Sequence, residues 1–194
     1  NVAIPGGIDG HRRDIDMVLR IIEKLNNKNI EFNFIGNILG IPGEKTLQKI
    51  NLLKQSGYNL NHYYDETDNR LFEKKMSESD IILSPLNVFT NYEGIKEVYG
   101  LTKSTGVVFD MMRFEKPGIV PVELNTNKNI ESSILKYKNE DDLINIIINL
   151  YNNPAYLQKL TDNAINNAKH FKKENLVERI LQELEIYNLQ PTKC

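Results

Sequence analysis

The chain has 194 residues, which is enough for one domain with a sizeable core and too few for two. Its 40% hydrophobic and 26% charged residues are typical of a soluble globular protein, and its formal net charge of −2 excludes a broadly basic surface for nucleic acid. The one cysteine, Cys194, excludes a disulfide within the chain and a cysteine-based metal site. No apolar run reaches the roughly 20 residues that a membrane-spanning helix needs. We expect a cytoplasmic protein.

Short apolar runs alternate with amphipathic stretches along the chain, which is the pattern of βα units around a parallel sheet. The expected strands are residues 2–5, 31–35, 59–64, 81–86, 119–124 and 134–137. The expected helices are residues 14–26, 43–56, 71–76, 105–114, a segment after 139, another from 154, and 174–187. These elements predict an α/β fold with a Rossmann-like, doubly wound parallel sheet of about six strands and closing C-terminal helices.

The last third of the chain carries two helix start signals. Asn139 precedes three acidic residues, which suit the positive end of a helix dipole. Asn153 and Pro154 combine a capping side chain with a proline at the first helical position. Residues 87–101 are predicted to form a long loop. No repeat or low-complexity linker divides the chain, which predicts a single domain, and its opening directly on a strand favours a fragment or processed product.

Two loops at the carboxyl ends of predicted strands are candidates for a ligand site, because open parallel sheets bind ligands there. In the first loop, Gly6 and Gly7 follow a strand directly and let the backbone approach a ligand. Arg12 and Arg13 then stand at a helix entry, where guanidinium groups suit a diphosphate. Adjacent side chains diverge, so we expect one of the two arginines to face the site; His11 could reach it too. A tight turn with a solvated basic pair explains the same residues.

The second loop opens the helix that holds Asp110. Ser104, Thr105 and Gly106 would present backbone N–H groups to a phosphate at the helix N-terminus, and Lys103 would add a positive charge. Asp110, about one turn deeper, can accept hydrogen bonds from a ribose diol. The alternative interpretation is an ordinary hydroxyl cap with a buried aspartate.

Other motifs point less directly to chemistry. Asp14 and Asp16 have the form of a D-x-D metal motif, but on a helix residues two apart point about 200° around the axis and cannot chelate one ion. The three histidines have no ligand spacing, so we expect no metal site. Tyr63 and Tyr64 end the third strand and could stack on a base, although aromatic residues at strand ends also serve as core.

Together these residues resemble the C-terminal domain of retaining GT-B glycosyltransferases, the group 1 or family 4-like enzymes, which bind nucleotide-diphosphate sugars in that domain. The resemblance covers nearly the whole chain in element order and is sharpest over residues 79–119 and 138–171. It implies one half of a GT-B fold. It also implies that an N-terminal acceptor domain lies outside this chain and that residues 174–194 form the crossover helix and tail.

The resemblance also implies roles for residues of the first loop. Arg13 matches the family lysine of the diphosphate site, and Gly7 matches the glycine before it. Ile8 stands where the family has its arginine, so Arg12 is the expected substitute.

In the second loop, Asp110 lies seven residues before Pro117 and matches the acidic residue that holds the ribose hydroxyls. Thr102 stands where the family has the acid that touches the donor sugar. The base is expected near Tyr63 and Tyr64.

The implied activity is hexosyl transfer from a nucleotide-diphosphate sugar, as in polysaccharide biosynthesis, without a bound metal or other cofactor. Arg13 and Lys103 would be the catalytic cations that stabilise the departing nucleoside diphosphate. The implied partners are the sugar nucleotide and the N-terminal domain, through which peripheral contact with the inner face of a membrane is possible, and this domain alone should be inactive. Two alternatives stay open: a non-catalytic nucleotide-binding or interaction module, favoured by Thr102, and a sugar-nucleotide epimerase of the same fold.

Overall fold

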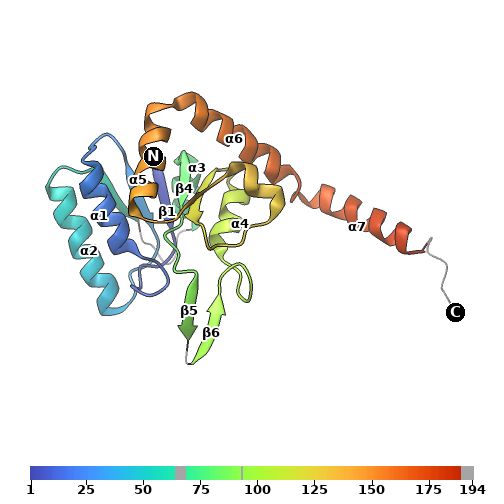
Figure 1. The fold of residues 1–194 in the computed structure, drawn as a ribbon, viewed down its shortest axis with the longest axis horizontal. Coiled ribbons are helices and arrows are strands. Elements are labelled where there is room, and N and C mark those ends of the chain that lie inside the picture. The colour runs from blue at the N-terminus through green and yellow to red at the C-terminus, as the bar shows by residue number, and fades with distance from the viewer. Residues whose placement is uncertain (64–68, 93, 189–194) are drawn as a thin grey trace.

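A computed structural model describes residues 1–63, 69–92 and 94–188 of the chain (Figure 1). Six parallel strands form one sheet in the order β3-β2-β1-β4-β7-β8. Their bounds are β1 Val2–Pro5, β2 Phe32–Ile35, β3 Leu60–Tyr63, β4 Ile81–Leu83, β7 Gly118–Pro121 and β8 Ile134–Tyr137. The strand order reverses between β1 and β4, which confirms the predicted doubly wound α/β fold and puts the topological switch point at these two strands.

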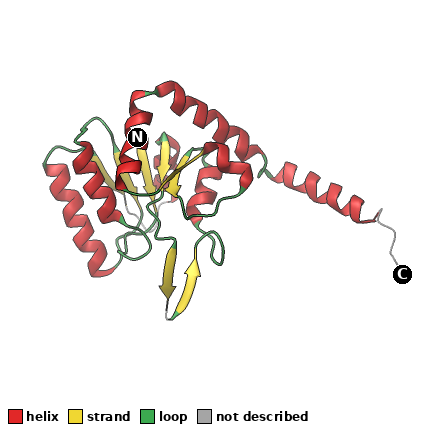
Figure 2. Ribbon diagram, in the orientation of Figure 1, coloured by secondary structure: helices red, strands yellow, loops and turns green. Residues whose placement is uncertain are grey.

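Helices cover both faces of the sheet (Figure 2). Their bounds are α1 Ile15–Leu25, α2 Gly40–Gln55, α3 Asn69–Glu78, α4 Gly106–Arg113, α5 Glu140–Asn152, α6 Pro154–Lys169 and α7 Lys173–Asn188. One core cluster joins α1, α2 and α5 to one face, where β1 contributes Val2 and Ile4. The other joins α3 and α4 to the opposite face, where β1 contributes Ala3. The central strands β1, β4 and β7 are buried on both faces, which explains why their sequences are continuous apolar runs.

Side-chain caps fix where several helices begin. Asp14 lies just before α1, where its carboxylate accepts a hydrogen bond from the Met17 amide at 2.8 Å. Asn139 and Asn153 cap α5 and α6 in the same way, as their sequence signals predict. The predicted helix 43–56 begins earlier, at Gly40, and the predicted strand 81–86 ends earlier, at Leu83.

The prediction of a long loop over residues 87–101 is wrong, because this segment contains a β-hairpin. Strands β5 (Phe89–Tyr92) and β6 (Ile95–Val98) pair antiparallel, with Phe89 opposite Val98 and Thr90 opposite Glu97. The hairpin projects beyond the carboxyl end of the sheet (Figure 1). A short 3₁₀ helix over Lys128–Ser133, which the sequence did not predict, precedes β8.

Helix α7 leaves the body of the molecule and extends away from it (Figure 1). Its exposed side chains include Leu176, Val177, Ile180 and Leu181, which recur at helical spacing. Over the part of the chain that the structure describes, no helix combines the length and the hydropathy that a bilayer crossing requires.

Candidate functional site

The loop after β1 is held in shape by the Asp9 side chain. One oxygen of Asp9 accepts the backbone N–H groups of His11 and Arg12, both at 2.9 Å, and the other accepts Nε of Arg12 at 2.5 Å. Burial alone would raise the pKa of Asp9, but these hydrogen bonds outweigh it and the pKa lies below its usual value. Arg12, which we predicted to bind phosphate, is therefore already paired with Asp9. Its side chain is exposed.

This first loop is also tied to the segment that follows β4. The Asp14 amide donates to the Pro85 carbonyl at 2.8 Å, and the Asn87 amide donates to the Arg12 carbonyl at 2.9 Å. The Asn87 side chain donates to the His11 carbonyl at 2.6 Å. Because β1 and β4 flank the switch point, these contacts build a rigid rim where the fold favours ligand binding.

Arg13 belongs to the same rim, where its backbone forms an antiparallel bridge with Leu86. The Arg13 guanidinium lies directly over Gly6, where a Cβ would collide with Nη2 and Cζ of Arg13. The φ of 107° at Gly6 also favours glycine. Nη1 of Arg13 makes a long hydrogen bond of 3.4 Å to the Gly7 carbonyl. The side chain is half-buried, and no carboxylate of the described residues lies within 4.0 Å of it.

Asp110 is a half-buried carboxylate on α4 that interacts electrostatically with Arg13. Burial raises the pKa of Asp110, and the positive charges of Arg113 and Arg13 oppose that rise. Burial likewise lowers the pKa of Arg13, with a further lowering by Arg12 and opposing contributions from Asp9, Tyr99 and Asp110. An arginine stays protonated in proteins, so the rim holds a fixed positive charge.

The entry of α4 is open. Thr105 stands at the capping position and is buried, but its side chain makes no capping hydrogen bond, so the first-turn N–H groups keep their capacity to bind an anion. A cavity of ≈ 290 Å³ lies at this helix entry, and Thr105 lines it. Thr126, 7% exposed, lines it too, and its hydroxyl has no partner among the described residues. Lys103 and Ser104 also line this cavity. Gly106 is less constrained than expected, because a Cβ there would meet nothing within 4 Å.

A larger groove, which we call the hairpin groove, lies between the first loop and the β5–β6 hairpin. It has a volume of ≈ 890 Å³, and its lining includes Asp9, Arg12, Glu97, Tyr99 and Lys103. Nζ of Lys103 lies 2.6 Å from Oε2 of Glu97 and 5.6 Å from the centre of the Tyr99 ring. The hydrogen bond that Lys103 donates to Glu97 is the main cause that raises the pKa of Lys103.

The hydroxyl of Thr102 is engaged by the backbone of Val98. The hydroxyl accepts the Val98 amide at 2.8 Å and donates to the Val98 carbonyl at 3.4 Å, which closes the turn at the base of the hairpin. The residue at the position of the missing acid therefore has a structural task in this chain.

The predicted base-binding tyrosines are not joined to this cluster by any described contact. Tyr63 ends the edge strand β3, packs against the second core cluster and carries Nζ of Lys75 at 4.7 Å from its ring centre. Tyr64 lies outside the described residues.

The D-x-D carboxylates are engaged separately. Asp14 caps α1, and Asp16 is exposed and pairs with Lys49 at 2.8 Å. Over residues 1–63, 69–92 and 94–188, no three His, Cys, Asp or Glu side chains gather into a set that could hold a metal ion.

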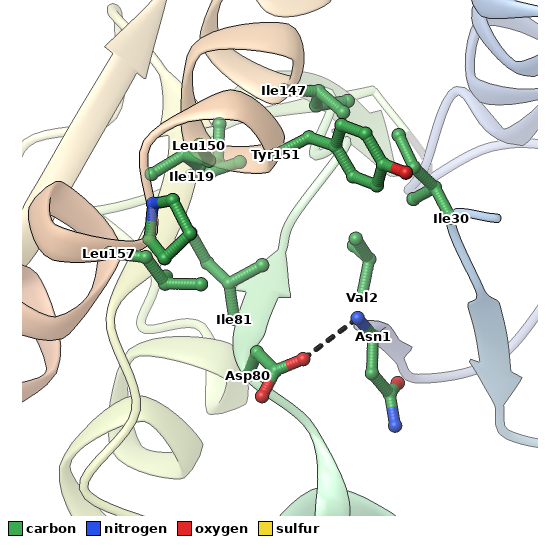
Figure 3. Close-up of a pocket in the computed structure, with 11 residues that line it drawn as sticks. Asn1, Val2, Ile30, Asp80, Ile81, Ile119, Ile147, Leu150, Tyr151 and Leu157 are labelled. Carbon is green, nitrogen blue, oxygen red and sulfur yellow. Dashed lines mark hydrogen bonds and ion pairs between the residues drawn. The ribbon is translucent and has the colours of Figure 1, made fainter. Parts of the chain in front are cut away.

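Another cavity lies at the amino ends of the strands, opposite the carboxyl ends described above (Figure 3). Its volume is ≈ 180 Å³, and mostly apolar side chains from the starts of the strands and from α5 and α6 line it, among them Ile81, Leu150 and Leu157. The amino group of Asn1 pairs with Asp80 at 2.8 Å beside it. Since parallel sheets bind ligands at their carboxyl ends, we do not place the site here.

Sequence reasoning missed Asp9, Asn87, Glu97 and Thr126. Asp9 had a signal, because an aspartate before a glycine is typical of turns in which its carboxylate bonds nearby amides. Glu97 and Thr126 had none, because their positions depend on the hairpin and on contacts between distant loops.

Comparisons with solved structures find the same fold at low sequence identity. The C-terminal domain of LpcC, a group 1 family glycosyl transferase of Francisella tularensis, is similar with a TM-score of 0.63 and 14% identity over 87% of this chain and 83% of that one. HepE of Anabaena in complex with UDP is similar with a TM-score of 0.64 and 12% identity over 95% of this chain and 48% of that one. Sucrose-phosphate synthase of Thermosynechococcus elongatus has a TM-score of 0.64 and 15% identity over 97% of this chain and 46% of that one.

No protein-family model and no curated protein matches the sequence. The structural likeness nevertheless confirms the predicted fold, which is the Rossmann-like fold of one half of a GT-B glycosyltransferase. The chain spans about half the length of HepE and of the sucrose-phosphate synthase.

Proposed function

We propose that this chain is the nucleotide-sugar-binding domain of a glycosyltransferase and that Arg13 binds the diphosphate of the donor. The half-buried guanidinium of Arg13, which lies over Gly6 with no described carboxylate within 4.0 Å, carries the proposal. A charge removed from water costs free energy unless an opposite charge compensates it. A planar guanidinium pairs well with phosphate oxygens, so a diphosphate is a fitting partner.

The proposal takes its other ligands from α4 and from the loop before it. The uncapped first turn of α4 would donate backbone N–H groups to a phosphate oxygen, helped by Ser104 and Lys103. Asp110, one turn deeper in α4, would accept hydrogen bonds from the ribose hydroxyls. Stacking of the base on Tyr63 is the least supported part of the proposal, because that ring is already packed.

The positive charge at the carboxyl end of the sheet suits the proposed reaction. Transfer of a hexosyl group breaks the bond between the anomeric carbon and the diphosphate oxygen, and negative charge develops on the departing nucleoside diphosphate. Arg13, Lys103 and the α4 amides would stabilise that charge without a bound metal. The acceptor would come from an N-terminal domain on which the exposed apolar residues of α7 dock, so this chain alone would bind the donor without transferring the sugar.

Calorimetry with UDP, GDP and ADP tests the proposal. We expect one of them to bind, and Arg13→Ala to weaken that binding about 10- to 100-fold, because a hydrogen-bonded charge contributes roughly 1.5–3 kcal/mol. Arg20→Ala is the matched control, since Arg20 is exposed and pairs with Glu140 at 2.7 Å. Failure of all three nucleotides to bind at millimolar concentration would contradict the proposal.

The hydroxyl contacts of Thr102 with Val98 favour a second candidate, a nucleotide-binding module without catalysis. The two candidates differ in turnover by a protein that also carries the acceptor domain. Transfer that disappears in Arg13→Ala and Asp110→Ala supports the enzyme. Nucleotide binding with no turnover in the wild type supports the module.

A further inference from the structure

The hairpin groove differs in charge from the position of Arg13 beside it. Its two cations, Arg12 and Lys103, are paired with its two lining carboxylates, Asp9 and Glu97, at 2.5 and 2.6 Å. The formal charges of these four groups cancel. The groove therefore offers hydrogen-bonding groups without net charge, whereas Arg13 offers an uncompensated charge.

The two carboxylates of the hairpin groove are not equally available. Both oxygens of Asp9 are taken, one by two backbone amides and the other by Arg12. Glu97 uses only Oε2, which Lys103 holds, and Oε1 makes no hydrogen bond among the described residues. Lys103 thus fixes the side chain while leaving one oxygen able to accept.

Further polar residues line the groove beside Glu97. Thr90 stands opposite Glu97 in the hairpin, so the two side chains lie on one face, and both line the groove. The Thr90 hydroxyl is buried without a partner among the described residues. Asn87 also lines the groove, and Tyr99 adds a buried ring. Acceptors and donors around an aromatic ring suit a ligand with several neighbouring hydroxyls and apolar C–H faces.

The hairpin groove adjoins the cavity at the α4 entry, which belongs to the proposed phosphate site. Lys103 lines both the groove and the cavity at the α4 entry, and Arg12 precedes Arg13 in the chain. A diphosphate bound at Arg13 and α4 would direct the group attached to it toward the hairpin.

We infer that the hairpin groove binds an uncharged sugar and that Glu97 determines specificity by accepting hydrogen bonds from its hydroxyls. This inference rests on the proposed function, since it names the class of sugar attached to the diphosphate. Glu97 on the β5–β6 hairpin would then contact the donor sugar, which the resemblance expects of an acid at the position of Thr102.

The test compares each nucleotide with its sugar form in calorimetry: UDP with UDP-glucose, ADP with ADP-glucose, and GDP with GDP-mannose. We expect at least one sugar nucleotide to bind more tightly than its nucleotide. Glu97→Ala should remove that gain, about tenfold in the ratio of the two affinities. The ratio is the quantity compared, because the substitution also releases Lys103, which would act on the nucleotide and on its sugar form alike. Glu97→Gln, which keeps an acceptor for Lys103, should retain part of the gain.

Glu78→Ala is the matched control, because Glu78 pairs with Lys75 at 3.0 Å on the surface, outside the groove. It should leave the ratio of the two affinities unchanged. An unchanged ratio in Glu97→Ala, or equal affinities for nucleotide and sugar nucleotide in the wild type, overturns the inference and leaves the nucleotide site standing. A wild type that binds no nucleotide removes the proposed function and this inference with it.

Discussion

Replacing Gly6 with alanine tests whether Arg13 works from the position it occupies. Gly6 has a φ of 107°, and an added Cβ would collide with the end of the Arg13 side chain. That end is flexible, so the guanidinium can swing away while the backbone of β1 stays in place. Gly6→Ala should therefore displace Arg13 from its position above the switch point without changing the arginine itself.

The expected magnitudes come from two separate effects. A side chain in this backbone conformation costs about 1–3 kcal/mol, and a chain of this size loses about 2–4 °C of Tm per kcal/mol. Stability should thus fall moderately. Nucleotide binding should fall by about tenfold or more, because the charge-assisted hydrogen bonds of Arg13 are lost.

Gly10→Ala separates these effects. Gly10 lies in the same loop with a φ of 73°, and its Cβ would meet Pro42 at 2.9 Å instead of Arg13. Its Tm should fall by a similar amount while nucleotide affinity is kept. In an Arg13→Ala background, Gly6→Ala should cause no further loss of affinity, since both changes remove one interaction. If calorimetry gives Gly6→Ala the affinity of Gly10→Ala, the assignment of the diphosphate to Arg13 is refuted.

Two further predictions concern stability. Burial raises the pKa of Asp110 in the folded protein above its usual value of 3.8. Between pH 3.8 and the raised pKa, the folded state binds more protons than the unfolded state, so the charged form of Asp110 destabilises the fold. Asp110→Asn should raise Tm at pH 7, and this gain should shrink to nothing as the pH falls through the folded pKa to below 3.8; a gain that persists in acid would contradict the cause. Asn139→Ala removes the acceptor of the Asp142 amide, 2.9 Å away, and should cost about 1 kcal/mol in urea unfolding. An unchanged urea midpoint would show that the cap is dispensable.

The sequence predicts those parts of the fold that local interactions determine. The bounds of β1 and β8 match the predicted runs, because a short apolar segment between turn residues has few other places to go. The caps at Asn139 and Asn153 are likewise local, since each side chain bonds an amide three residues on. Nothing distant can easily override such contacts.

The β5–β6 hairpin and the direction of Arg13 could not be predicted in the same way. The hairpin had a signal, two runs rich in β-branched and aromatic residues around Gly94, but each run is only four residues long. Which of Arg12 and Arg13 turns inward depends on Asp9 holding the first and on Gly6 leaving room for the second. Both causes are tertiary.

The relation between Arg13 and Asp110 supports a ligand between the loops. The two opposite charges shift each other's pKa values, yet no described contact brings them within 4.0 Å. Neither group therefore has an ion-pair partner among the described residues, although burial makes the charged form of each less favourable. A nucleoside diphosphate would instead satisfy each separately, its phosphates with Arg13 and its ribose with Asp110. Because a nucleotide would bind the folded state only, the Tm should rise with nucleotide concentration.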